Sequence, residues 1–199
     1  MRGRSRPLFF LRIVNRVGSM LGQRRIPMSE RGQMSTIAML LFPIAMALAA
    51  SSDLLTMRIS NKLVLFLVAS FCVVALAINL PLQQFGMHIA CAVVVLAVGF
   101  TLFALRWIGG GDAKLAAATT LWLGFGLTLP YLVYAALLGG VLTLAILALR
   151  NIPLTPFLAR HRWLERLHDP KQGVPYGIAL ALAGMLVYTN STIFERLTA

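Results

Sequence analysis

Long apolar runs separated by short polar connections dominate the chain from about residue 35 onward. A helix that crosses the hydrocarbon core of a bilayer needs about 20 residues, with a range of about 17–25. About six runs come close to this length, and they cover about 35–52, 62–80, 86–108, 113–129, 131–149 and 176–194. The pattern predicts an all-α integral membrane protein, a bundle of about six transmembrane helices over residues 35–194.

The fourth run, the connection that follows it and the last run have distinctive residues. The run 113–129 is rich in Ala, Gly and Thr, and such small residues let membrane helices approach closely. Pro130 cannot donate the helical hydrogen bond, so we predict a tight turn there between the fourth and fifth helices. The last run ends in Thr189–Thr192, which places its far end in the membrane interface.

Composition excludes a soluble domain. Of 199 residues, 59% are apolar and 12% are charged, whereas soluble domains carry roughly 45–50% apolar and about 25% charged residues. The net charge is +12, but the basic residues concentrate in the N-terminal stretch and in the connections between apolar runs. This favours the positive-inside effect over nucleic-acid binding, so we expect no nucleic-acid partner.

The connections predict the topology. The connections after the first, third and fifth runs carry basic residues, and the fifth of these connections is the polar loop 150–175. The second and fourth connections carry none. The odd-numbered connections are therefore predicted to be cytoplasmic. The arginine-rich arm 1–33 conflicts with this placement. If translation starts at Met28 or Met34, most or all of the conflict disappears, and the arm is not part of the functional protein. If the arm is translated, it lies on a membrane face as an amphipathic helix or the first span is built differently.

Cysteine and histidine give no sign of a disulfide or a metal centre. Cys72 and Cys91 lie inside apolar runs and are expected to pack as small apolar residues. His88, His161 and His168 share no ligand spacing with acidic residues. We expect no metal and no cofactor.

Two carboxylates are candidates for chemistry among only six acidic residues in the chain. Asp53 ends the first apolar run and Asp112 begins the fourth, and the topology puts both at the cytoplasmic side. The remaining acidic residues lie in the arm, the polar loop and the tail: Glu30, Glu165, Asp169 and Glu195. Ionisable groups at membrane depth are costly and are usually functional.

A pair of carboxylates suits an aspartic peptidase. Two neighbouring carboxylates cannot both ionise easily, so one keeps its proton. The ionised partner then takes a proton from water, while the protonated one polarises the scissile carbonyl. From spacing alone, plain structural roles explain the residues equally well: Asp112 as a helix N-cap and Asp53 as a solvated loop residue.

Three segments resemble signatures of the type IV prepilin peptidases, which are GxGD membrane aspartic peptidases. Asp53–Asn61 resembles the signature of Asp, five residues and Ile-Pro-Asn, and Gly109–Leu115 resembles Gly-x-Gly-Asp-x-Lys. Val174–Ala179 is similar to the Pro-Tyr/Phe-Gly segment that opens the family's last helix. The segments occur in the family's order, and the resemblance covers about 35–194. One departure is Ser60, which stands where the family usually has Pro.

The resemblance implies an aspartic endopeptidase of the bacterial inner membrane, with Asp53 and Asp112 as the catalytic pair. It would cut the basic leader from a prepilin at the cytoplasmic face during type IV pilus biogenesis. Its partners would be the prepilin, through its leader peptide and N-terminal helix, and membrane lipid. The residues expected to bind substrate or to shape the site are Gly109, Gly111, Lys114, Asn61, Pro175, Tyr176 and Gly177.

The size resembles the short branch that serves Flp or tight-adherence pili. Larger members carry an extra region with a CxxC pair and also methylate the product, and methyltransferase activity is not expected here. Two other functions fit the same aspartates: a small proton-coupled transporter using them as a relay, and a non-catalytic pilus-assembly factor. A relay needs polar residues along the depth of the bundle, and the second, third and fifth runs offer almost none.

Overall fold

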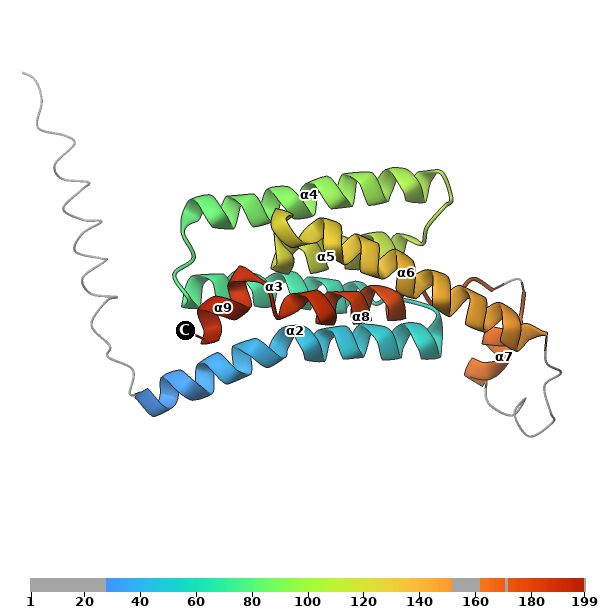
Figure 1. Ribbon diagram of the computed structural model, residues 1–199, viewed down its shortest axis with the longest axis horizontal. Helices are drawn as coiled ribbons and strands as arrows, with labels where there is room; N and C mark the ends of the chain where they lie inside the picture. The colour runs from blue at the N-terminus through green and yellow to red at the C-terminus, as the bar shows by residue number, and fades with distance from the viewer. Residues whose placement is uncertain (1–27, 152–161, 171, 199) are drawn as a thin grey trace, which may run out of the picture. The chain divides into compact units, whose positions relative to one another are not determined.

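The computed structural model describes residues 28–151, 162–170 and 172–198, and every regular element within them is a helix (Figure 1). The helices are α2 (Met28–Thr56), α3 (Asn61–Ala77), α4 (Leu82–Ala104), α5 (Gly110–Leu123), α6 (Phe125–Arg150), α7 (Arg162–His168), α8 (Gly177–Tyr188) and α9 (Thr192–Thr198). The chain divides into two units, and the account below concerns the second, Thr36–Ala199. The all-α class is confirmed. Predictions for residues 1–27 and for His161 lie outside the described residues.

Helix α5 is the centre of this unit. It contacts α3, α4, α6 and α8, and most of its side chains are buried. Small residues on both sides allow this close packing. Gly99 of α4 faces Ala113 of α5, and a Cβ added at Gly99 would lie only 3.1 Å from the Ala113 Cβ. The predicted close approach of this helix is confirmed, and it places the first turn of α5 between its neighbours.

An aromatic cluster joins α5 to the helices on its other side. The ring of Phe42 in α2 stacks on Tyr188 of α8 with centroids 4.5 Å apart, and it lies 5.4 Å from the ring of Trp122. Trp122 is fully buried, and its Nε1 donates a 3.0 Å hydrogen bond to the Leu67 carbonyl of α3. Aromatic pairs at these distances contribute beyond their buried area. This cluster fixes α2, α3 and α8 around α5.

The turn between α5 and α6 lies at Gly124, so the prediction of a turn at Pro130 is wrong. Gly124 adopts a φ of 71°, which glycine reaches without penalty, and its N–H bonds to the Thr120 carbonyl. A Cβ there would meet the buried ring of His88, whose Nδ1 contacts the Leu121 carbonyl at 2.8 Å. Pro130 instead lies inside the second turn of α6.

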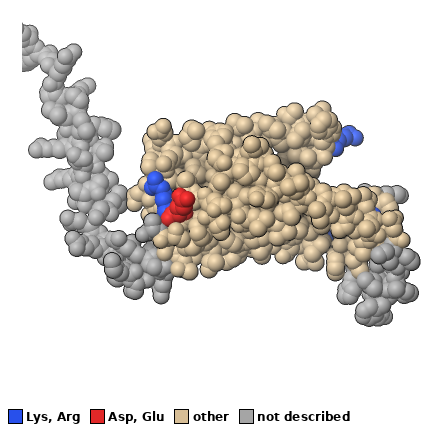
Figure 2. All heavy atoms as spheres, viewed as in Figure 1, with Lys and Arg blue, Asp and Glu red and all other residues tan. Residues whose placement is uncertain are grey.

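The outer helices present apolar side chains outward. Most exposed large apolar residues lie on α2, α3, α4 and α6. In Figure 2, the described basic and acidic atoms on the visible face lie only near the two ends of the helices. Within the described residues, α2, α4 and α6 are long and apolar enough to cross a membrane, and α8 with α9 forms a pair bent by 50° that adds a fourth span if counted as one. These helices make the chain a multi-pass membrane protein, and the number six stays a prediction.

The polar loop predicted at 150–175 is structured in part. Helix α7 buries Leu164 and Leu167 against Ile146 of α6. The Arg150 guanidinium of α6 donates to the carbonyls of Leu167 at 2.7 Å and Gln172 at 2.9 Å. The described part of the loop is therefore anchored to α6, and it leads directly into the start of α8.

Candidate active site

Three connections meet at one end of the helices. They are the loop after α2, the loop before α5 and the segment before α8, and Figure 1 shows them at the same end. Side-chain bonds link them: Gly177 to Asp53, Lys114 to Asn61, and Arg166 to the Leu55 carbonyl. The sequence prediction that these connections share one side agrees with this arrangement.

Asp53 lies in the last turn of α2 and is only 5% exposed. A carboxylate at a helix C-terminus faces the negative end of the helix dipole, which is unfavourable. The opposite helix end compensates, because the N–H of Gly177, the first residue of α8, donates a 2.7 Å hydrogen bond to Asp53 Oδ2. The N-terminus of α8 thus holds this carboxylate in place.

The loop that follows Asp53 is tightly folded back. Met57 has a φ of 54°, in the left-handed region that is uncommon outside glycine, and its N–H bonds to the Asp53 carbonyl at 2.8 Å. The hydroxyls of Ser52 and Thr56 both donate to the Arg58 carbonyl, at 3.0 and 3.1 Å. This fold places Ile59 beside the site.

Asp112 lies in the first turn of α5 and is half-buried. Gly109 is the N-cap, and the Asp112 carboxylate accepts a hydrogen bond from the Gly109 backbone. This is the reciprocal half of a capping box, so Asp112 does stabilise the helix start, although it is not the N-cap residue itself. This structural role is compatible with the catalytic role predicted for Asp112.

The electrostatics connect the two carboxylates. Asp112 is in α5, which is too short to count among the candidate spans. Burial, and then the negative charge of Asp53, raise the pKa of Asp112 from 3.8 to about 6, while the hydrogen bond from Gly109 acts in the opposite direction. The structure therefore brings Asp53 and Asp112 into electrostatic contact. Such a pair holds one proton over a range of pH and titrates as a unit.

The glycines around the pair leave room for the carboxylates. A Cβ added at Gly109 would lie 2.7 Å from Asp112 Oδ2, and one at Gly177 would lie 2.7 Å from Asp53 Oδ2. A Cβ at Gly111 would lie 3.2 Å from the Ile59 Cβ. Side chains at Gly109 and Gly177 would displace the two carboxylates. Close approach of a substrate backbone to these glycines stays a prediction.

Pro175 and Tyr176 position the start of α8. Pro175 is fully buried. The Tyr176 ring packs directly on Gly139 of α6, and its hydroxyl donates a 3.0 Å hydrogen bond to the Ala135 carbonyl. Gly139 and Ile59 also shape the site, although neither was predicted from the sequence. The Gly139-Gly140 pair inside an apolar run was the available signal for the first.

Lys114 and Asn61 meet on the exposed side of the site. Lys114 Nζ donates a 3.1 Å hydrogen bond to Asn61 Oδ1, which ties the start of α5 to the start of α3. The interactions that set the pKa of Asp112 do not include Lys114. The pair thus braces two helix ends that flank the carboxylates.

Ser60 occupies the position where the family usually has proline, and the structure shows what its side chain does there. It is the N-cap of α3, and its side chain accepts a 3.2 Å hydrogen bond from the Lys62 N–H. Its φ of −68° is the value that a proline ring imposes. A side-chain cap thus replaces ring stiffness at the same backbone conformation.

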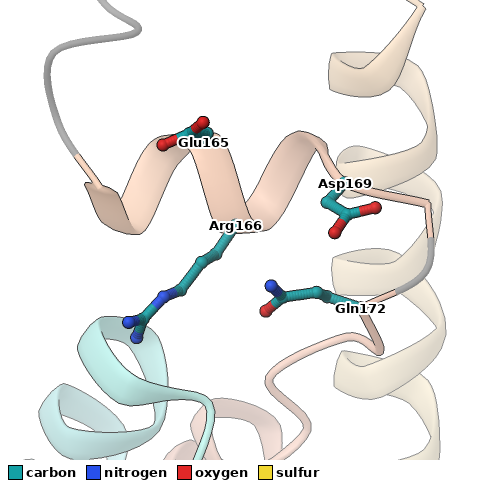
Figure 3. Close-up of a pocket in the computed structure, with 4 residues that line it drawn as sticks. All are labelled: Glu165, Arg166, Asp169 and Gln172. Carbon is teal, nitrogen blue, oxygen red and sulfur yellow. The ribbon is translucent and has the colours of Figure 1, made fainter.

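Two hollows adjoin this end of the molecule. A groove of about 510 Å³ reaches Asp112 between α4, α5 and α6. A second hollow of about 490 Å³ is lined by Glu165, Arg166, Asp169 and Gln172 (Figure 3). In Figure 3, Arg166 extends from α7 toward a neighbouring helix, and its Nη1 donates to the Leu55 carbonyl of α2 at 3.4 Å. No group of three or more His, Cys, Asp or Glu among the described residues could hold a metal ion.

Comparison with known proteins gives one match. A family model described as the type IV leader peptidase family matches residues 40–144, which include both Asp53 and Asp112. No curated protein and no solved structure matches the chain.

Proposed function

Because the chain belongs to the type IV leader peptidase family, we propose that it is an aspartic endopeptidase that removes the leader from Flp-like type IV prepilins. The observation that carries the proposal is the buried Asp53 beside Asp112, with Asp53 held by the first N–H of α8. A structural carboxylate at the C-terminal end of a helix would gain nothing from a second carboxylate nearby. A catalytic pair requires one.

The pair supplies acid–base chemistry without a cofactor. The ionised carboxylate takes a proton from a water molecule, and the water oxygen forms a bond to the scissile carbonyl carbon. The protonated carboxylate gives its proton to the carbonyl oxygen. Breakdown of the tetrahedral intermediate breaks the C–N bond, and a proton passes to the leaving amine. Since the pair shares its proton, the roles belong to the pair and not to either residue.

The location proposed is the cytoplasmic face of the bacterial inner membrane. The basic residues of the odd-numbered connections include Arg58, Lys62, Lys114, Arg150 and Arg166. Such residues favour the cytoplasmic side of a membrane. The family resemblance implies that prepilin leaders are cut on that side, so substrate and site would meet there.

Processing in membranes tests the proposal. Membranes containing the wild type are incubated with a prepilin, and the shortened product is followed by gel and by N-terminal sequencing. We expect product with the wild type and none with Asp53→Asn or Asp112→Asn. If both variants still process the leader, the aspartic mechanism is wrong, and a non-catalytic assembly role becomes the better account.

A further inference from the structure

Two tyrosine hydroxyls lie in the core with no hydrogen-bond partner among the described residues. They belong to Tyr131 of α6 and Tyr188 of α8, and both side chains are buried. A buried hydroxyl without a hydrogen bond costs free energy, so each one needs a physical reason. Tyr188 has an apolar one, because its ring packs in the aromatic cluster against Phe42 and Trp122. Tyr131 has a different environment.

The charge of Asp112 reaches the Tyr131 hydroxyl. The Tyr176 hydroxyl and the Thr119 side chain act on it as well. Tyr176 is held on the same part of α6, because its hydroxyl donates to the carbonyl of Ala135, one helical turn after Tyr131. The charge of Asp112 acts on Tyr176 too. Polar groups of α5, α6 and the segment before α8 therefore converge near Asp112.

Thr119 extends this polar set along α5. It follows Asp112 by seven residues, which places both on one face of the helix, and the small residue Ala116 lies between them on that face. Thr119 is fully buried, and its hydroxyl donates to the Met46 Sδ at 3.7 Å. A thioether is a weak acceptor. Two buried hydroxyls, one on α5 and one on α6, thus lie near each other without a strong hydrogen bond.

Water is the ligand that these groups suit. Buried waters typically make two to four hydrogen bonds to buried polar groups that otherwise lack partners. Tyr131 and Thr119 offer two hydroxyls, and the Asp112 carboxylate offers acceptor oxygens. The Tyr131 hydroxyl is within the field of Asp112 but is not hydrogen-bonded to it, and a bridging water covers such a separation.

We propose that Tyr131 is a positioning residue for the aspartate pair: together with Thr119 it holds a buried water that donates a hydrogen bond to the Asp112 carboxylate. The inference rests on the proposed function. The hydrogen bond orients a carboxylate that must exchange protons with the substrate and the attacking water. It also favours the ionised form of Asp112, since a donor stabilises the charge.

Two matched variants test the role of the hydroxyl. Tyr131→Phe removes the oxygen and keeps the ring, and Tyr188→Phe does the same at the other buried hydroxyl without a partner. Both are assayed for prepilin cleavage, and each is checked for the wild-type unfolding midpoint. We expect Tyr131→Phe to lower kcat by at least about tenfold with KM within about twofold, and Tyr188→Phe to keep both within about twofold of the wild type.

The pH profile separates positioning from packing. Without the donor, the pair keeps its proton to higher pH, so the fall in rate should move upward by about half a unit or more in Tyr131→Phe. A packing defect would leave the pH of the fall unchanged. A folded Tyr131→Phe protein with kcat within about threefold of the wild type, or with an unmoved pH profile, would overturn the inference. The titratable groups around Asp112 are Asp53 of α2, Lys114 of α5, Tyr131 of α6 and Tyr176 before α8.

Thr119→Val tests whether the two hydroxyls share one water. Loss of either hydroxyl releases a shared water, so the double variant should have a kcat within about twofold of the slower single variant. Independent losses that multiply in the double variant would overturn the shared site. Thr119→Val also carries the pH test if Tyr131→Phe does not fold. Cleavage by Asp53→Asn or Asp112→Asn would instead overturn the proposed function, so the two failures are distinguishable.

Discussion

Gly177→Ala is the sharpest perturbation that leaves both aspartates in place. The added Cβ would lie 2.7 Å from Asp53 Oδ2 and 2.9 Å from the Ile59 Cδ1. Ordinary van der Waals contact begins at 3.4 Å, so the carboxylate or the start of α8 must move by roughly 0.7 Å, close to the ~1 Å displacement that costs about 100-fold in rate. The same movement lengthens the 2.7 Å bond between the Gly177 N–H and Asp53.

The expected loss of activity is therefore large and the loss of stability is moderate. We expect kcat/KM for prepilin cleavage to fall by about 100-fold, while overpacking lowers the free energy of unfolding by about 1–3 kcal/mol. Cleavage is measured with purified protein in detergent, and stability by thermal unfolding in the same detergent. Gly173→Ala is the control, because a Cβ there meets nothing within 4 Å. A Gly177→Ala protein that is folded and cleaves within threefold of the control would refute the role assigned to the α8 N-terminus.

Four further outcomes follow from the site and the core. Since the pKa of Asp112 is raised to about 6, the singly protonated pair is lost as pH rises through that value, and we expect the cleavage rate to fall there; a rate that keeps rising from pH 5 to 8 would contradict this. The raised pKa also means that the folded protein binds this proton more tightly than the unfolded chain does, so thermal stability should decline as pH rises from 3.8 to about 6 and level off above that value. Ser60→Pro loses a side-chain cap but restricts the unfolded chain at a compatible φ of −68°, so its stability should stay within about 1 kcal/mol of the wild type by denaturant unfolding, with activity retained. Trp122→Phe removes the 3.0 Å bond to the Leu67 carbonyl and leaves a void in the core, which should cost about 1–3 kcal/mol in the same assay; an unchanged midpoint would argue against that packing.

The proximity of Asp53 and Asp112 was predictable from sequence because acidic residues are so scarce in this chain. With six in total, Asp53 and Asp112 stand out at the ends of apolar runs, and counting charges in the connections puts them on one side. The loop charges also put the segment that ends at Pro175 on this side, but the membership of Pro175-Tyr176-Gly177 in the site came only from the resemblance. No spacing rule indicates that the Gly177 N–H reaches a carboxylate 124 positions earlier.

Other features depend on tertiary contacts and were missed for that reason. The turn was placed at Pro130 because proline is the stronger local signal, but the positive φ and the contact with His88 make Gly124 the turn residue. The packing of the polar loop could not be predicted because Leu164 and Leu167 are isolated among charges, and only the fold shows that they pack on Ile146. The groove could not be predicted, since it depends on how far apart α4 and α6 lie.

The most direct test of the catalytic pair uses purified protein reconstituted in liposomes, where no other peptidase is present. Cleavage of a prepilin is measured by mass spectrometry of both products for the wild type, Asp53→Asn and Asp112→Asn, each checked for the wild-type unfolding midpoint. The pair predicts a single cut by the wild type and at least about a thousandfold lower rates for each folded variant, because neither carboxylate can replace the other. A folded variant that retains a rate within tenfold of the wild type would contradict the account.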